Sequence, residues 1–108
     1  MSRAVLLTAG AERDLASIYD YIVDSTGERT AERVLERLLE VAERLREFPE
    51  RGSHPAELLA LGIREFRQVL MDPYRIVYRV IDDRVIILLI ADGRRDMQSL
   101  LAQRLLEA

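Results

Sequence analysis

A run of seven apolar residues without a charge, residues 85–91 (VIILLIA), constrains this chain more than any other feature. The run is far too short to span a bilayer, so we expect a buried strand at the centre of a sheet, covered on both faces. Of the 108 residues, 49% are apolar and 32% are charged, which is typical of a folded domain that buries its own core. The sequence therefore predicts a single domain over residues 1–108.

The segments around this run predict the rest of a sheet. Residues 74–81 (YRIVYRVI) alternate, with the two tyrosines on one face and Arg75 and Arg79 on the other. The links on either side of this segment are short enough for hairpins. Three segments are expected to form an antiparallel meander: residues 63–70, 74–81 and 84–91. The short, largely apolar segment 3–7 (RAVLL) predicts a separate N-terminal strand.

Apolar residues at helical spacing predict helices over residues 9–24 and 28–48. The short turn between them makes the pair an antiparallel helix hairpin. A C-terminal helix is marked by the apolar residues Met97, Leu100, Leu101 and Leu105. The order is strand, helix, helix, three strands and helix, so the sequence predicts an α+β fold.

The composition narrows the chemistry available to the chain. There is no cysteine and only one histidine, so disulfides, thiolate zinc sites and a cysteine nucleophile are excluded, and no metal or other cofactor is expected. All 16 basic residues are arginine, and the net charge of −3 differs from the basic charge usual for general nucleic-acid binders. The N-terminus does not have the pattern of a signal peptide, and no segment predicts a membrane span, so we expect a cytoplasmic protein.

Four arginines are the strongest candidates for a functional role. Arg75 and Arg79 project from one face of the same expected strand, where they form either a solvated pair or a site for a phosphate or carboxylate. Arg94 and Arg95 follow the central strand. They belong either to a structural turn in which Asp92 caps the next helix or to a functional site, since functional groups are common at such strand ends. The pattern alone leaves both alternatives open for each pair.

Other polar and aromatic residues favour a structural role. His54 stands in a loop rich in Gly, Ser and Pro, without a second histidine or a cysteine for a metal site. Tyr74 and Tyr78 alternate with apolar residues, so we expect them in the core rather than stacked on nucleic-acid bases. The sequence has no Gly-rich phosphate loop and no Ser/His/Asp arrangement.

Segments along nearly the whole chain resemble the RelE/ParE superfamily of toxins. LTAGAERDLASIYDYI at residues 7–22 resembles the first helix of that family, and PERG at residues 49–52 with IREFR at residues 63–67 resembles its loop and second strand. PYRIVYRV at residues 73–80 resembles the third strand, and DGRRDM at residues 92–97 resembles the turn after the fourth. The resemblance implies the RelE/ParE fold and a toxin neutralised by a small antitoxin in a tight complex.

The resemblance also implies one of two activities. RelE-like members cut messenger RNA on the ribosome, using basic residues of the sheet and a C-terminal tyrosine or a histidine, whereas ParE-like members poison DNA gyrase. Arg75 and Arg95 match the RelE-type arginines, and Arg67 is the nearest basic residue on the second strand. Leu101 stands in place of the tyrosine, and Asp92 stands where many relatives have histidine. The sequence therefore lacks an evident acid to pair with a base for RNA cleavage.

These departures favour a ParE-like toxin that inhibits DNA gyrase by binding and is not an enzyme. The alternatives are a RelE-like, ribosome-dependent messenger RNA endoribonuclease that uses Arg67, Arg75 and Arg95, and a member that has lost its toxicity. The expected partners are a ParD-like antitoxin in a hetero-oligomer and either gyrase or the ribosome. The arginines expected to contact the target or an anion are Arg75, Arg79, Arg94 and Arg95. The leucines expected to contact the antitoxin are Leu100, Leu101 and Leu105.

Overall fold

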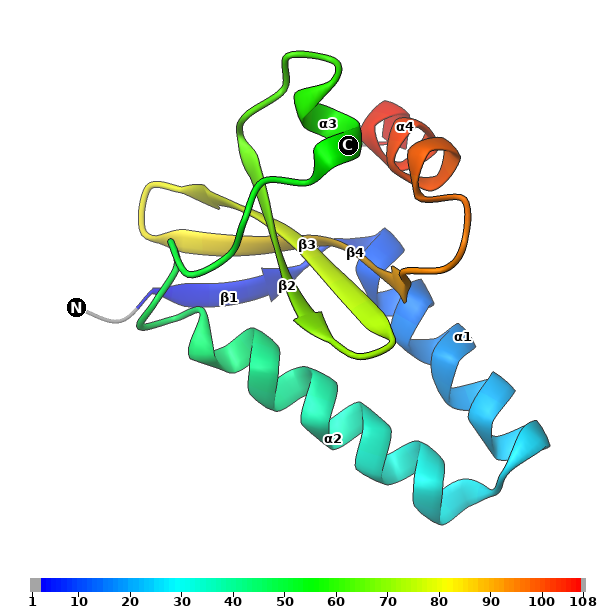
Figure 1. The fold of residues 1–108 in the computed structure, drawn as a ribbon. Coiled ribbons are helices and arrows are strands. Elements are labelled where there is room, and N and C mark those ends of the chain that lie inside the picture. The colour runs from blue at the N-terminus through cyan, green and yellow to red at the C-terminus, as the bar shows by residue number, and fades with distance from the viewer. Residues whose placement is uncertain (1–2, 108) are drawn as a thin grey trace.

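The chain folds into a four-stranded sheet with helices on both faces (Figure 1). The structure is a computed structural model and describes residues 3–107. In chain order, its elements are β1 (Ala4–Leu7), α1 (Ala9–Ser25), α2 (Glu28–Arg44), α3 (Ala56–Leu59), β2 (Phe66–Met71), β3 (Tyr74–Ile81), β4 (Arg84–Asp92) and α4 (Met97–Glu107). The α+β fold and the expected order of elements are confirmed, with the four-residue helix α3 as an addition between α2 and β2. No helix in the described range is long and apolar enough to cross a membrane.

The strands lie in the order β1-β4-β3-β2, so the apolar strand β4 lies inside the sheet as expected. β2, β3 and β4 form the antiparallel meander, while β1 pairs with β4 in parallel. The parallel pairing stops at Leu7 and Ile87, beyond which α1 begins. The outer edge of β4 therefore continues past the last residue of β1.

Each face of the sheet contributes to a separate apolar cluster, since side chains alternate along a strand. The cluster beneath the α1–α2 hairpin includes Leu38, Ile76, Tyr78, Val85 and Ile87. The cluster beneath α3 and α4 includes Leu58, Val77, Leu89, Met97 and Leu101. From Ile87 to Ala91 both faces of β4 are thus covered, which confirms the interpretation of most of its apolar sequence.

Two element boundaries differ by three or four residues from those expected, and the others by one residue at most. The second helix ends at Arg44 rather than at residue 48, because the next three amides bond to carbonyls three residues back and the chain tightens into a turn. β2 begins at Phe66 rather than at residue 63, because the Ile63 amide donates to the Leu58 carbonyl and closes the turn after α3. Apolar spacing continues through both turns, so it does not mark where the regular element ends.

Candidate functional site

The guanidinium of Arg75 is held by neighbouring side chains. Its Nη1 and Nη2 donate to Glu57 Oε2 and Oε1 at 2.9 and 2.8 Å, and its Nε donates to Gln68 Oε1 at 2.7 Å. The side chains of Arg75 and Glu57 are only 12% and 26% exposed. The pKa of Glu57 is lowered, mainly because its carboxylate accepts these bonds. Arg75 is therefore not a solvated arginine, and an external anion would have to displace Glu57.

Gly93, in the turn after β4, allows the stem of Arg75 to approach the backbone. A Cβ atom at residue 93 would lie 2.9 Å from Arg75 Cδ and 3.1 Å from its Cγ. The two residues line a cavity of about 340 Å³ to which Arg94 also contributes. Arg95 is not among the residues that line it. The cavity therefore brings Arg75 together with Arg94 and not with Arg95.

Arg94 pairs with Asp92 in the same turn. Arg94 Nε and Nη2 donate to Asp92 Oδ1 and Oδ2 at 3.0 and 2.6 Å, and the Arg94 amide donates to Oδ1 at 2.9 Å. These hydrogen bonds lower the pKa of Asp92 to about 2, so its carboxylate is a weak proton acceptor. α4 is capped by Asp96, which accepts from the Ser99 amide, and not by Asp92. Arg95 is exposed.

Arg67 and Arg79 lie on opposite faces of the sheet and away from this cavity. Arg67 Nη1 donates to the Gly52 carbonyl at 2.8 Å. The Cζ of Arg79 lies 5.5 Å from the centroid of the Phe66 ring, in a cation–π contact. Both arginines line a second, smaller cavity of about 140 Å³, which Arg75 and Arg95 do not line. The four basic residues Arg67, Arg75, Arg79 and Arg95 do not converge on one point.

Tyr74 and Tyr78 pack in the cluster beneath the helix hairpin, as expected, and His54 contacts the backbone. Tyr78 is fully buried, and its hydroxyl donates to the Pro49 carbonyl at 2.7 Å and accepts from the Gly52 amide at 3.0 Å. Burial raises the pKa of Tyr78 and that of Tyr74, so neither phenol is a base at neutral pH. His54 Nδ1 lies 2.9 Å from the Phe66 carbonyl oxygen. Within residues 3–107, no cluster of acidic or histidine side chains could hold a metal ion.

The C-terminal leucines differ in exposure. Leu101 is fully buried in the cluster beneath α4, so the expectation that it contacts an antitoxin is wrong for this conformation. Leu100 and Leu105 are half-buried against the same cluster. Leu106 is the exposed one, at 88%. Contact of Leu100 and Leu105 with the antitoxin stays a prediction.

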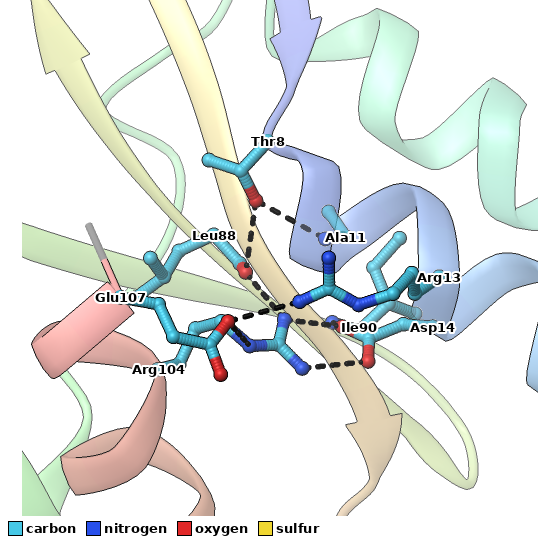
Figure 2. A network of polar contacts seen from close by, with 8 residues as sticks. All are labelled: Thr8, Ala11, Arg13, Asp14, Leu88, Ile90, Arg104 and Glu107. Atoms are coloured by element: carbon cyan, nitrogen blue, oxygen red, sulfur yellow. Dashed lines mark hydrogen bonds and ion pairs between the residues drawn. The ribbon is translucent and has the colours of Figure 1, made fainter.

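Figure 2 shows a second polar cluster, which connects α4 to α1 and the sheet. Arg104 Nη1 and Nη2 each donate to Asp14 at 2.8 Å, and Nη1 also donates to the Leu88 carbonyl. Asp14 Oδ2 in turn accepts from the Ile90 amide at 2.9 Å. A Cβ at Gly10 would lie 2.8 Å from Arg104, so glycine leaves room for that side chain. The cluster satisfies backbone groups of β4 that have no neighbouring strand.

The partners of these arginines could not be found from the sequence pattern. Glu57 lies 18 residues before Arg75, and Asp14 lies 90 residues before Arg104. Helical spacing brings charges together only three or four residues apart. The sole signal in the sequence is that acids and arginines are both abundant, at 19 and 16 residues.

Comparisons with known proteins agree with this architecture. A family model described as the ParE toxin of the type II toxin–antitoxin system parDE matches residues 5–97. The chain is similar to a solved structure of the chromosomal ParDE system from P. aeruginosa, with a TM-score of 0.72, 23% identity, and coverage of 84% of this chain and 96% of that one. It is also similar to the toxin–antitoxin complex RelBE2 from Mycobacterium tuberculosis, with a TM-score of 0.61, 23% identity, and coverage of 85% and 92%. At this identity the two likenesses concern the fold. No curated protein matches the sequence significantly.

Proposed function

Because the chain belongs to the family of ParE toxins of type II toxin–antitoxin systems, we propose that it inhibits DNA gyrase by binding it, without catalysing a reaction. We also propose that a ParD-like antitoxin neutralises it in a hetero-oligomeric complex. The similar structures from P. aeruginosa and M. tuberculosis, described as a toxin–antitoxin system and a toxin–antitoxin complex, support an antitoxin partner.

The observation that favours gyrase over messenger RNA as the target is the pairing of Arg75 with Glu57. A RelE-like reaction would place this arginine on an RNA phosphate, but both of its terminal nitrogens donate to Glu57. A two-point arginine–carboxylate pair is among the stronger polar contacts in a protein. A phosphate would have to displace it before the arginine could contribute to cleavage.

The groups around Arg75 are also poorly suited to proton transfer: the nearest carboxylate, Glu57, is engaged by Arg75, and this pairing lowers its pKa. RNA cleavage needs a base for the 2′-hydroxyl and an acid for the leaving oxygen. Asp92, with a pKa of about 2, is a poor base, and Leu101 is buried and has no ionisable group. Arginine does not readily release a proton. Binding to gyrase requires a complementary surface and none of this chemistry.

We propose that Arg94 and Arg95 belong to the surface that contacts the target. Both lie in the exposed turn between β4 and α4, and the Arg94 side chain is 81% exposed. Exposed arginines in loops are frequent anchors of protein–protein interfaces. Arg75 and Arg79 would contribute only where the target displaces Glu57 or reaches the half-buried guanidinium of Arg79.

The test compares the purified toxin in two assays. Incubated with gyrase and supercoiled plasmid, it should inhibit supercoiling or trap cleaved DNA; programmed ribosomes should yield no codon-dependent cuts in the messenger. In cells it should cause filamentation and DNA damage while translation continues at first. The double variant R94E/R95E should act on gyrase at least about tenfold more weakly. The control for a charge reversal elsewhere is R33E, which reverses one exposed arginine of α2.

Two outcomes contradict the proposal. Messenger cleavage without an effect on gyrase would indicate the RelE-like activity and make Arg67, Arg75 and Arg95 the first residues to substitute. Gyrase inhibition that is equal for the wild type, R94E/R95E and R33E would keep the target and refute the proposed contact surface.

A further inference from the structure

The cavity of about 340 Å³ that Arg75 lines lies at one end of the sheet, between the β2–β3 turn and the turn that follows β4. The Gly93 amide donates to the Pro73 carbonyl at 2.8 Å and ties these two turns together. In Figure 1 the β2–β3 turn and the tip of β4 lie at the same end of the sheet. We refer to this cavity as the end cavity. Its volume is typical of sites that enclose a ligand, which measure about 300–1,000 Å³.

The walls of the end cavity are largely hydrocarbon. Leu70 is 67% exposed, and Tyr74 is half-buried. Pro73 and the stem of Arg75, which lies against Gly93, add further carbon atoms. An exposed leucine beside an aromatic ring is a surface that gains free energy when a partner covers it.

The balance of charge around the end cavity is negative. The guanidinium of Arg75 pairs with Glu57, and that of Arg94 pairs with Asp92, so both positive charges are neutralised. Asp72 also lines the cavity and is exposed. Within residues 3–107, no arginine lies within 4.0 Å of the Asp72 carboxylate. Three carboxylates therefore face two arginines, which leaves one negative charge beside an apolar wall.

We propose that the end cavity binds a basic side chain of the target protein, with the apolar stem against Leu70 and Tyr74 and the cationic head on Asp72. This inference rests on the gyrase target proposed above and adds the site and the chemistry of one contact. A long basic side chain suits the cavity because its stem matches the walls while its charge matches the free carboxylate. The aromatic ring adds attraction for a cation.

The position of the end cavity favours the target as the source of this side chain. Arg94, which we place on the surface that contacts the target, is part of the cavity wall. Arg95 follows it in the exposed turn and does not line the cavity. A target seated on this turn would therefore reach the end cavity and Arg95 in one contact.

Charge distinguishes a basic side chain from three other occupants. A phosphate of a nucleic acid would meet the unpaired Asp72 carboxylate, while both nearby arginines are already paired. An acidic side chain would meet the same repulsion. A purely apolar side chain would exclude water from Asp72 and leave its charge without a partner, which is costly.

The test measures the affinity of the purified full-length toxin for assembled DNA gyrase, for the wild type, D72N, L70S and D83N. D72N should weaken binding about tenfold near 0.1 M salt and by less at high salt, because it removes the charge and keeps the shape. L70S should weaken binding about tenfold at both salt concentrations, because it removes apolar contact. The matched control D83N makes the same change at an exposed aspartate of the β3–β4 turn and should bind as the wild type does.

Two further measurements keep the test decisive. Circular dichroism and melting of each free variant show that it is folded, and if L70S misfolds, D72N remains the test because Asp72 is exposed. The same variants are also measured against the antitoxin encoded beside the toxin, which all of them should bind as the wild type does.

The outcomes separate the inference from the proposed function. Wild-type affinity for gyrase in both D72N and L70S refutes the end cavity as a contact and leaves the gyrase target intact. Tighter binding of gyrase by D72N would mean that the cavity meets an anion, and it would overturn the inference. A loss of binding confined to the antitoxin would assign the cavity to that partner and overturn it as well. Failure of the wild-type toxin to bind gyrase refutes both proposals.

Discussion

Removal of the Asp14 carboxylate should weaken the attachment of α4 to α1 and the sheet. The carboxylate accepts from the Ile90 amide and from two nitrogens of Arg104, at 2.8–2.9 Å, and both ionic side chains are only 14% exposed. The variant D14A removes the closest partner of a mostly buried positive charge, leaving it only Glu107 at 3.7 Å, and it leaves a strand amide without an acceptor. Breaking a buried pair on one side costs about 3–5 kcal/mol, and partial exposure favours the lower end. We expect a loss of about 3 kcal/mol in the free energy of unfolding, or roughly 12 °C in Tm.

A double-mutant cycle measures the Asp14–Arg104 interaction itself. Urea unfolding of D14A, R104A and D14A/R104A should yield a coupling free energy of about 2 kcal/mol, because the double variant leaves no unpaired charge. The matched control is R13A, which removes an ion pair at 3.0 Å with Glu107 whose side chains are 64% and 43% exposed. An exposed pair of this kind contributes at most about 1 kcal/mol. A coupling near zero for Asp14 and Arg104, or equal losses for D14A and R13A, would refute the argument.

Two further predictions concern other buried or partly buried contacts. Y78F removes a buried hydroxyl that satisfies two backbone groups of the loop after α2. The free energy of unfolding, measured in urea, should fall by about 2 kcal/mol, and an unchanged midpoint would contradict this. The pKa of Glu57 is lower in the folded state than its ordinary value near about 4.3, mainly through its bonds from Arg75, so the folded state binds fewer protons. The stabilisation from the pair is present above about pH 4.3 and is lost as the pH falls below it. The unfolding midpoint of E57Q should therefore depend less on pH in that range than the midpoint of the wild type. Equal pH dependence of the two midpoints would refute the pairing.

Local patterns in the sequence were sufficient to predict the order of the main strands and helices and which residues face the core. The apolar stretch at residues 85–91 predicted an inner strand covered on both faces, and β4 has that position. The alternation of residues 74–81 predicted that Tyr74 and Tyr78 face the core, and both pack in the cluster beneath the helix hairpin. These predictions succeeded because the side-chain periods of strands and helices are local properties of the backbone.

The tertiary structure alone decided which charges meet and which leucines are exposed. The sequence left Arg75 either solvated or a site for a phosphate or carboxylate, and only the folded chain brings Glu57 of α3 to it. Leu101 was one of several leucines on the C-terminal helix, and only the docking of α4 on the sheet shows that it is buried. An ion pair or a buried contact depends on where distant segments lie in space. Neither composition nor spacing along the chain specifies that position.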